Sequence, residues 1–147
     1  MRRLLRQLAL SAWIAVAGPA CAQATPEALA GAKLAGAHEV KKMLDAGHLV
    51  VDTRTKSEYA ESHIKGARNI TYHEKSVKHV NFDATQDRFD LSKLPADKNN
   101  PVIFYCNAGE CWKSFKASTL AIGAGFKNVY WFRGGFPEWR ANGLPVE

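Results

Sequence analysis

Three short apolar runs constrain the fold more than any other feature of the sequence. They lie within residues 48–54 (HLVVDTR), 101–106 (PVIFYC) and 128–132 (NVYWF). None of them alternates polar with apolar residues, as a strand with one solvated face would. Continuously apolar strands are typical of parallel sheets that helices cover on both faces. We therefore predict a small α/β domain with a central parallel β-sheet flanked by helices on both faces.

The segments around these runs have the patterns of helices and of one further short strand. Residues 37–46 (AHEVKKMLDA) place their larger apolar side chains on one helical face, and Gly47 is a suitable helix end. The remaining expected elements are helices over residues 56–62, 112–124 and 136–141 and a strand over residues 67–70.

The expected elements fit one domain in a chain of 147 residues. We predict that this domain spans residues 37–147 and that the Ala-rich residues 25–36 form a tail in front of it. Residues 72–98 show no clear periodicity. Because they are long for a structureless connection, we expect them to carry a helix or to cover a site.

The first 24 residues have the three parts of a secretory signal peptide. Three arginines precede an apolar run, which Gly18-Pro19 ends before a stretch of small residues. Cleavage after Ala22 or after Ala24 fits this pattern, and lipidation of Cys21 is the less favoured alternative. The apolar run is shorter than the roughly 20 residues that cross a bilayer. The pattern predicts a periplasmic or secreted protein with no membrane span after cleavage.

Removal of residues 1–24 changes the charge of the protein. These residues contain three arginines and no acid, so the formal net charge falls from +6 to +3. No basic stripe remains that would indicate nucleic-acid binding. A mildly positive surface suits a small anionic substrate. An oxidising compartment would also allow the two remaining cysteines to form a disulfide.

The segment FYCNAGECWKS (residues 104–114) carries the chemistry. Cys106 follows the apolar run of residues 101–105, at the expected carboxyl end of a strand, where parallel sheets bind ligands. Inward-facing loop N–H groups and the start of the next helix would favour a thiolate there. We predict that Cys106 is the catalytic nucleophile, in a loop formed by Asn107, Ala108, Gly109, Glu110, Cys111, Trp112 and Lys113.

Individual residues of this loop have expected roles. Gly109 would ease a tight backbone turn, Lys113 would add positive charge at the mouth, and Trp112 could form a wall of the pocket. Cys111 has two interpretations. It could attack an oxidised or sulfur-loaded Cys106 and form a disulfide, or it could be a small apolar residue that fills space under the loop.

Other uses of the two cysteines do not fit the pattern. A cysteine phosphatase with Cys-x5-Arg spacing would need an arginine where Trp112 stands. A zinc site needs four ligands, and no second ligand pair accompanies Cys106 and Cys111. Haem attachment through Cys-x-x-Cys-His is absent from the sequence. We predict no metal and no cofactor.

Three stretches in order resemble the rhodanese family of sulfurtransferases: LVVDTRTKSEYAESHIKGARNI, then VIFYCNAGECWKS, then GAGFKNVYWFRGGFPEWRANGLPV. The resemblance covers about residues 37–146. It implies that Cys106 takes sulfane sulfur from a small anionic donor such as thiosulfate, or from a protein persulfide. Cys106 would then hold this sulfur as a persulfide and pass it to a thiophilic acceptor.

The active-site loop departs from the pattern of many single-domain members, Cys-x-x-Gly-x-Arg-Ser. Gly109 is in place, and alignment from the following helix puts Lys113 and Ser114 on the family's arginine and serine. The sequence is then about two residues longer, around residues 110–112. The Cys-Trp pair resembles a rhodanese-like subgroup, some of it linked to periplasmic alcohol oxidation.

Three residues outside the loop are candidates for substrate binding or support. Asp52 and Arg54 match the family's Asp-x-Arg, which mainly ties the loop to the sheet. A helical ion pair between Arg54 and Glu58 is an alternative. Arg133 precedes a double glycine whose loop in the family lies near the catalytic loop, and it could contact an anionic donor.

Three functions therefore remain open at the level of sequence. The protein could be a periplasmic sulfurtransferase, a thiol–disulfide or sulfur-relay protein that cycles Cys106 with Cys111, or a non-catalytic binding module with a rhodanese fold.

Overall fold

The structure is a computed structural model that describes residues 23–147. The predicted signal sequence, apart from its last two residues, and Cys21 lie outside the described residues. Within residues 23–147, no helix is long and apolar enough to cross a membrane.

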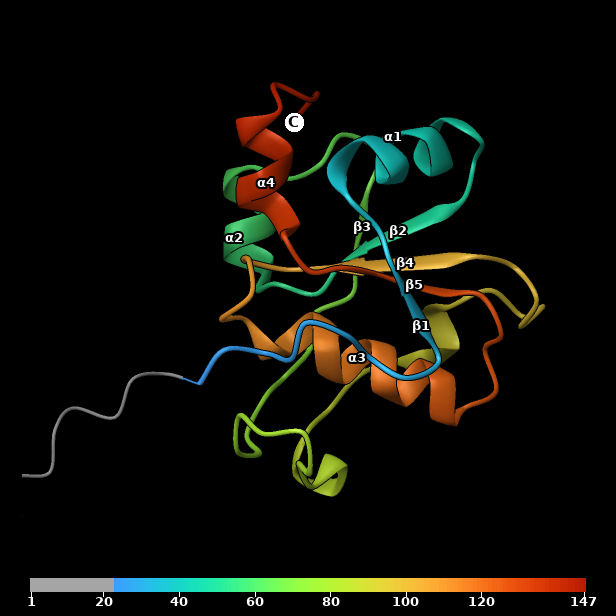
Figure 1. Cartoon of the computed structure of the whole chain (residues 1–147), viewed down its shortest axis with the longest axis vertical. Helices are drawn as coiled ribbons and strands as arrows, with labels where there is room; N and C mark the ends of the chain where they lie inside the picture. Colours follow the sequence, from blue (N-terminus) through green and yellow to red (C-terminus); the bar gives the residue numbers. More distant parts are fainter. Residues whose placement is uncertain (1–22) are drawn as a thin grey trace, which may run out of the picture.

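A five-stranded parallel sheet forms the centre of the domain, in the order β1-β5-β4-β2-β3. Its central strand β4 is fully buried, as expected for the apolar run that forms it. All strands run in one direction, so their carboxyl ends meet at one edge (Figure 1). The strands are β1 (Ala32–Leu34), β2 (Leu49–Asp52), β3 (Arg68–Asn69), β4 (Val102–Tyr105) and β5 (Val129–Phe132).

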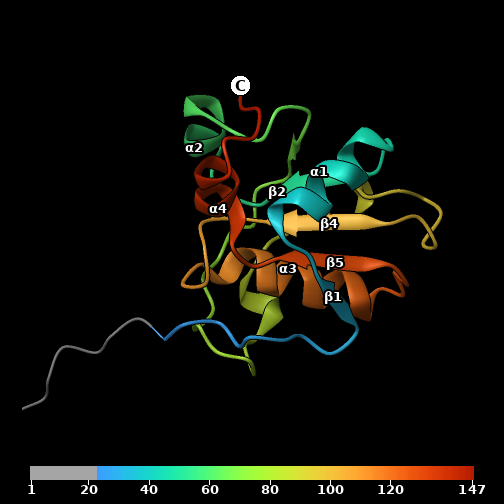
Figure 2. The same cartoon turned by 45° about the horizontal axis from the view of Figure 1, so that its top comes forward.

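Helices cover both faces of the sheet, which confirms the predicted architecture. In Figures 1 and 2, α1 and α4 lie on one side of the sheet and α3 lies on the other. The bounds are α1 (Ala37–Asp45), α2 (Lys56–Glu61), α3 (Trp112–Gly123) and α4 (Gly135–Ala141), with two 3₁₀ turns at Ala84–Gln86 and Leu91–Lys93.

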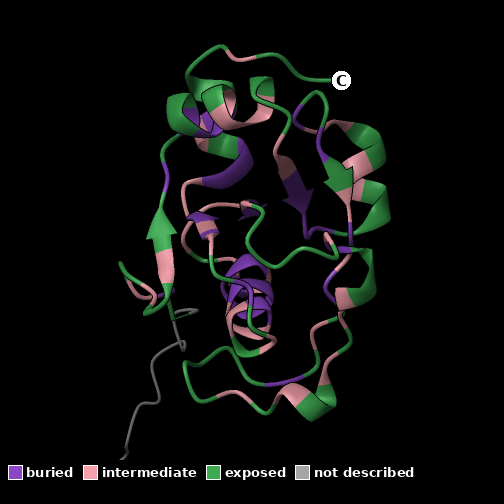
Figure 3. Cartoon of the chain, turned by 90° about the vertical axis from the view of Figure 1, so that its right-hand side faces the viewer, coloured by how far each residue is buried: buried purple, intermediate pink, exposed green. Residues whose placement is uncertain are grey.

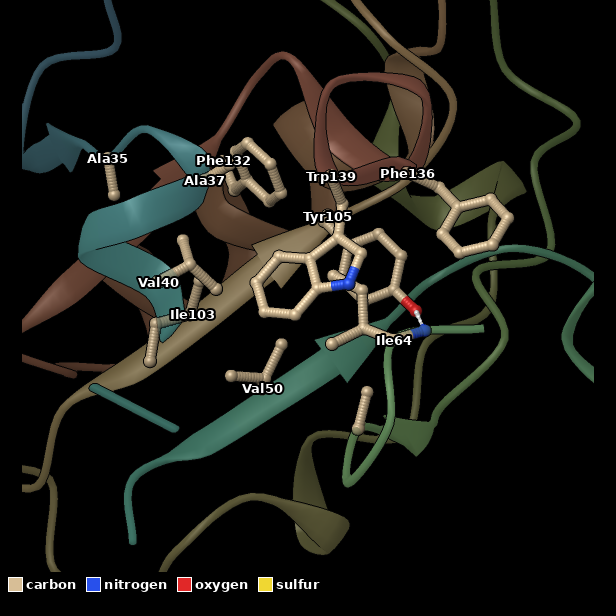
Figure 4. Close-up of a cluster of buried hydrophobic side chains, with 11 residues drawn as sticks. Ala35, Ala37, Val40, Val50, Ile64, Ile103, Tyr105, Phe132, Phe136 and Trp139 are labelled. Carbon is tan, nitrogen blue, oxygen red and sulfur yellow. Dashed lines mark hydrogen bonds between the residues drawn. The ribbon is translucent and has the colours of Figure 1, made fainter. Parts of the chain in front are cut away.

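Alternate residues of β4 build the two halves of the core. Ile103 and Tyr105 belong to the apolar cluster under α1 and α4 (Figure 4), whereas Val102 and Phe104 belong to the cluster under α3. The Tyr105 hydroxyl accepts a hydrogen bond from the Ile64 N–H at 3.2 Å. Figure 3 shows buried residues in the sheet and in α3. Burial on both faces explains why the strands read as uninterrupted apolar runs.

One segment differs from its expectation, and another matches it in part. Residues 25–36 were expected to form a tail, but Thr25 is buried and residues 32–34 form the edge strand β1 beside β5. Residues 72–98 carry two 3₁₀ turns and fold back against α3 through the buried Lys116. The Lys116 ammonium donates to Ser76 Oγ at 2.8 Å and lies 2.8 Å from a carboxylate oxygen of Glu74.

Candidate active site

Cys106 directly follows β4 and is almost completely buried, with 1% of its surface exposed. The chain then turns through residues 107–110, and Cys111 forms the N-cap of α3. Ala108 adopts a left-handed backbone conformation with φ of 48°, and its carbonyl accepts a hydrogen bond from the Cys111 N–H at 3.2 Å. The loop thereby brings Cys106 and the first turn of α3 together.

Ser114 provides the closest polar surroundings of the Cys106 sulfur. Its hydroxyl lies 3.1 Å from Sγ, and its backbone N–H points at Sγ from 3.4 Å. The hydroxyl oxygen accepts a hydrogen bond from the indole N–H of Trp131 at 3.0 Å, so its own proton is free to point at the sulfur. The Cys111 carbonyl lies 3.2 Å from Sγ and can accept a hydrogen bond from the neutral thiol. The two donors of Ser114 and the helix start favour the thiolate.

Cys106 and Cys111 are joined as a disulfide, with their Cα atoms 6.2 Å apart. This separation lies within the usual range for disulfides. The two partners differ in access. Cys111 lines a cavity of about 310 Å³ together with Trp112, Lys113, Lys78 and other residues, whereas Cys106 lies beneath the loop. Lys113 thus lines the cavity that Cys111 faces, and its effect on the thiol stays a prediction.

Asn107 connects the loop to α2. Its side-chain amide donates to Glu58 at 2.7 Å, and Glu58 also completes a capping box with Thr55. Burial tends to raise the pKa of Glu58, but the hydrogen bonds from Thr55 and Asn107 outweigh it and hold that pKa below its usual value. Glu58 therefore caps its helix and holds the loop, in place of the alternative ion pair with Arg54.

Two glycines permit the close packing around the loop. A Cβ at Gly109 would lie 2.9 Å from the Arg133 guanidinium carbon, so Gly109 makes room for that side chain, while Ala108 takes the left-handed turn. Gly135 has φ of 59°, and a Cβ there would collide with the Cys106 carbonyl oxygen. That carbonyl accepts a hydrogen bond from the Phe136 N–H at 2.9 Å.

Arg133 faces the segment before β1. Its guanidinium donates to the carbonyls of Thr25 and Pro26, both at 2.9 Å. Thr25 in turn bonds the Gly109 carbonyl through its N–H at 2.8 Å and its hydroxyl at 2.6 Å. The Trp112 indole donates to the Gln23 carbonyl at 2.7 Å. Residues 23–26 therefore form a strap along the outer side of the loop, and Arg133 anchors it.

Asp52 and Arg54 form a buried ion pair at the end of β2. Arg54 donates to both carboxylate oxygens of Asp52 and to the Ser62 carbonyl at 2.8 Å. The Tyr105 hydroxyl donates to Asp52 at 2.6 Å. Burial, together with the negative charge of Asp52, raises the pKa of Tyr105 well above its usual value. Because Tyr105 directly precedes Cys106, the pair ties the end of β4 to β2.

The sequence did not single out three residues that shape the site. Ser114 was aligned with a serine of the family but not selected as a site residue, and Trp131 was assigned to the core. Trp131 is buried, but its polar edge completes the hydrogen-bond chain to Cys106. Thr25 was placed in the tail. Its role depends on contacts with residues more than eighty positions away, which no local pattern reveals.

Comparisons with known proteins agree with this geometry. Residues 36–142 match the Rhodanese-like domain family. This chain belongs to the rhodanese-like family. It is 30% identical over 105 residues to thiosulfate sulfurtransferase 16 of Arabidopsis thaliana, covering 71% of this chain and 84% of the relative. It is also 30% identical over 106 residues to the thiosulfate sulfurtransferase GlpE of Haemophilus influenzae, covering 72% and 86%.

Solved structures show the same rhodanese fold. The crystal structure of the Alr3790 protein from Anabaena sp. superposes with a TM-score of 0.56 at 28% identity, covering 77% of this chain and 90% of that one. Among the relatives, those named thiosulfate sulfurtransferase support a sulfurtransferase function for this rhodanese-like chain at the level of the family.

Proposed function

We propose that this protein is a sulfurtransferase that carries sulfane sulfur as a persulfide on Cys106. The observation that supports this most directly is the position of the Cys106 sulfur. It lies at the carboxyl end of the central strand, where the Ser114 hydroxyl and N–H both point at it. These donors stabilise negative charge on Cys106 Sγ, which carries that charge as the attacking thiolate and again as the thiolate that leaves in the second step.

The transfer takes place in two displacement steps. The Cys106 thiolate attacks the outer sulfur of thiosulfate, the sulfur–sulfur bond of the donor breaks, and sulfite leaves with the electron pair. A thiophilic acceptor then attacks the outer sulfur of the persulfide, and Cys106 leaves as a thiolate. A group that is stabilised as a thiolate is a good leaving group in the second step. A protein persulfide could replace thiosulfate as the donor.

Reduction must precede the first step. In the disulfide form, the Cys106 sulfur is bonded to Cys111 and is not available as a nucleophile. We therefore propose that the disulfide is the resting form and the dithiol the active one. This fits the proposed export of the protein to the periplasm, where disulfides persist. The proposal of export rests on the signal-peptide pattern of residues 1–24.

The sulfurtransferase is favoured over a non-catalytic binding module and over a protein whose main activity is thiol–disulfide exchange. The relatives named thiosulfate sulfurtransferase are the reason for this choice.

A thiosulfate–cyanide assay tests the proposed function. Protein reduced with dithiothreitol and desalted should convert thiosulfate and cyanide to sulfite and thiocyanate, and Cys106→Ser should form neither product. Oxidised protein should be inactive until it is reduced. Thiocyanate formation by Cys106→Ser at the wild-type rate would overturn the assignment of Cys106.

A further inference from the structure

Cys111 places a second thiol within bonding reach of the proposed sulfur carrier. The loop geometry already joins Cys111 Sγ to Cys106 Sγ, the atom that would become the inner sulfur of a persulfide. No rearrangement of the loop is therefore needed for Cys111 to reach that atom. Cys106 and Cys111 are also the only two cysteines among residues 23–147. A persulfide on Cys106 would therefore stand within reach of the Cys111 thiol.

We propose that Cys111 resolves the Cys106 persulfide and releases its outer sulfur as sulfide, an activity that rests on the proposed sulfurtransferase function. The Cys111 thiolate attacks Cys106 Sγ, a bond forms between these two sulfurs, and the bond to the outer sulfur breaks. The outer sulfur leaves with the electron pair and takes up the proton that the Cys111 thiol has lost, so that it departs as hydrosulfide. Two cysteine sulfurs are oxidised to a disulfide, and the sulfane sulfur is reduced to sulfide, so the electrons balance without an external oxidant.

The surface beside Cys111 suits the departure of an anion. Lys78 and Lys113 are among the residues that line the cavity beside Cys111. Its carboxylates, Glu74 and Glu110, complete the charged part of the lining. Glu74 is paired with the buried Lys116 at 2.8 Å. With Glu74 balanced by Lys116, Lys78 and Lys113 outnumber the remaining carboxylate, Glu110, and this small excess of positive charge favours the departure of hydrosulfide toward solvent.

The unequal access of the two sulfurs determines how the disulfide is reduced again. Cys111 faces the cavity, whereas Cys106 is 1% exposed. An incoming thiolate therefore attacks Cys111, and Cys106 leaves as the thiolate that Ser114 stabilises. A dithiol reductant would complete the reset by a second exchange, which frees Cys111 and oxidises the reductant. The protein then couples persulfide reduction to the consumption of one dithiol.

A single-turnover experiment tests the resolving role. The full chain with Cys21→Ser is used, so that Cys106 and Cys111 are the only cysteines. Protein reduced with dithiothreitol is desalted under nitrogen and mixed with thiosulfate but no acceptor. Sulfite, free sulfide and intact mass are then followed. This Cys21→Ser protein, the parent of the variants below, should release one equivalent of sulfide for each sulfite. It should also lose the mass of two hydrogen atoms, but only when thiosulfate is present.

The matched variants are Cys111→Ser and Cys111→Ala. Both should form sulfite, keep the added mass of one sulfur atom, and release no sulfide. If either variant loads and releases sulfide as fast as the parent, or if the parent keeps its persulfide, the resolving role is overturned while the proposed function stands. If the reduced parent and both variants form no sulfite, the proposed function itself fails.

A separate experiment shows which sulfur of the disulfide an incoming thiolate attacks. Oxidised parent protein is treated with limiting glutathione, quenched with acid, and cleaved after Glu110, which separates the two cysteines into different peptides. The glutathione adduct should be found on the peptide that contains Cys111. An adduct mainly on the Cys106 peptide would overturn the proposed order of attack.

Discussion

Replacement of Ser114 by alanine is the sharpest test of how the fold activates Cys106. The change removes the hydroxyl that lies 3.1 Å from the sulfur but leaves the backbone N–H at 3.4 Å in place. A hydrogen bond to a charged group contributes about 1.5–3 kcal/mol. At a pH where most of the thiol is protonated, the thiolate fraction should therefore fall roughly ten- to a hundredfold in Ser114→Ala.

The rate of alkylation should fall by less than the thiolate fraction does. A less stabilised thiolate is intrinsically more nucleophilic, and this recovers about half of the loss on a logarithmic scale. The reduced Ser114→Ala variant should thus react with iodoacetamide roughly three- to tenfold more slowly than the reduced protein that keeps Ser114 in the same background. Measurements use the Cys111→Ser background, so that Cys106 is the only loop cysteine and no disulfide forms.

Ser118→Ala is the matched control for this prediction. Ser118 lies one turn further along α3, is fully buried, and its hydroxyl has no hydrogen-bond partner among residues 23–147. Its removal should leave the alkylation rate unchanged and should not lower stability. Ser114→Ala should also lower the free energy of unfolding in urea by about 1–3 kcal/mol, because the buried Trp131 N–H loses its acceptor. Equal alkylation rates for the two variants would refute the role of the Ser114 hydroxyl.

Three further predictions concern the support of the site and the stability of the domain. Gly143 has φ of 66°, and nothing in the described part of the chain lies within 4 Å of an added Cβ, so Gly143→Ala should lower the free energy of unfolding in urea by about 1–2 kcal/mol. Gly135→Ala should lower it clearly more, because the added Cβ also collides with the Cys106 carbonyl oxygen. Equal losses for the two variants would contradict this packing against Cys106. Arg133→Lys keeps the charge but removes the guanidinium that bridges the carbonyls of Thr25 and Pro26, so the free energy of unfolding should fall by about 1–3 kcal/mol. The KM for thiosulfate should stay near the value of the unsubstituted protein. A large rise in KM would instead indicate that Arg133 binds the donor. Burial tends to raise the pKa of Asp87, but hydrogen bonds, chiefly from Ser76, outweigh burial and hold this pKa at about 2, below the usual 3.8. The stability contributed by Asp87 is therefore complete above about pH 4 and is lost as pH falls toward 2, by about 2 kcal/mol in all, and Asp87→Asn should flatten this part of the acid-unfolding curve.

The sequence predicted the sheet well because the strands are buried on both faces. Continuous apolar runs over β2, β4 and β5 are a local signal, and each run corresponds to a strand. The strand β1 has no such signal, since Ala32–Leu34 is short and partly exposed at the sheet edge. Its pairing with β5 depends on residues about a hundred positions away.

The site was predictable where its chemistry follows from position along the chain. Cys106 stands at the end of a strand, and Cys111 stands at the start of a helix, so the sequence placed both in one loop. Which side chains surround the sulfur was not predictable in the same way. Trp131 reaches Ser114 from a neighbouring strand, and this depends on the register of β4 and β5. Arg133 was expected to contact an anionic donor, but its guanidinium donates to the Thr25 carbonyl, because a segment expected to be a tail packs against the loop.

The central claim is that Cys106 carries sulfane sulfur, and the intact mass of the loaded protein tests it most directly. In the Cys111→Ser background, where the persulfide cannot be resolved, reduced protein treated with thiosulfate should gain the mass of one sulfur atom. Cyanide should remove this mass, and replacement of Cys106 by serine should prevent its appearance. A gain that persists without Cys106, or no gain while Cys106 is reduced and reactive, would contradict the claim.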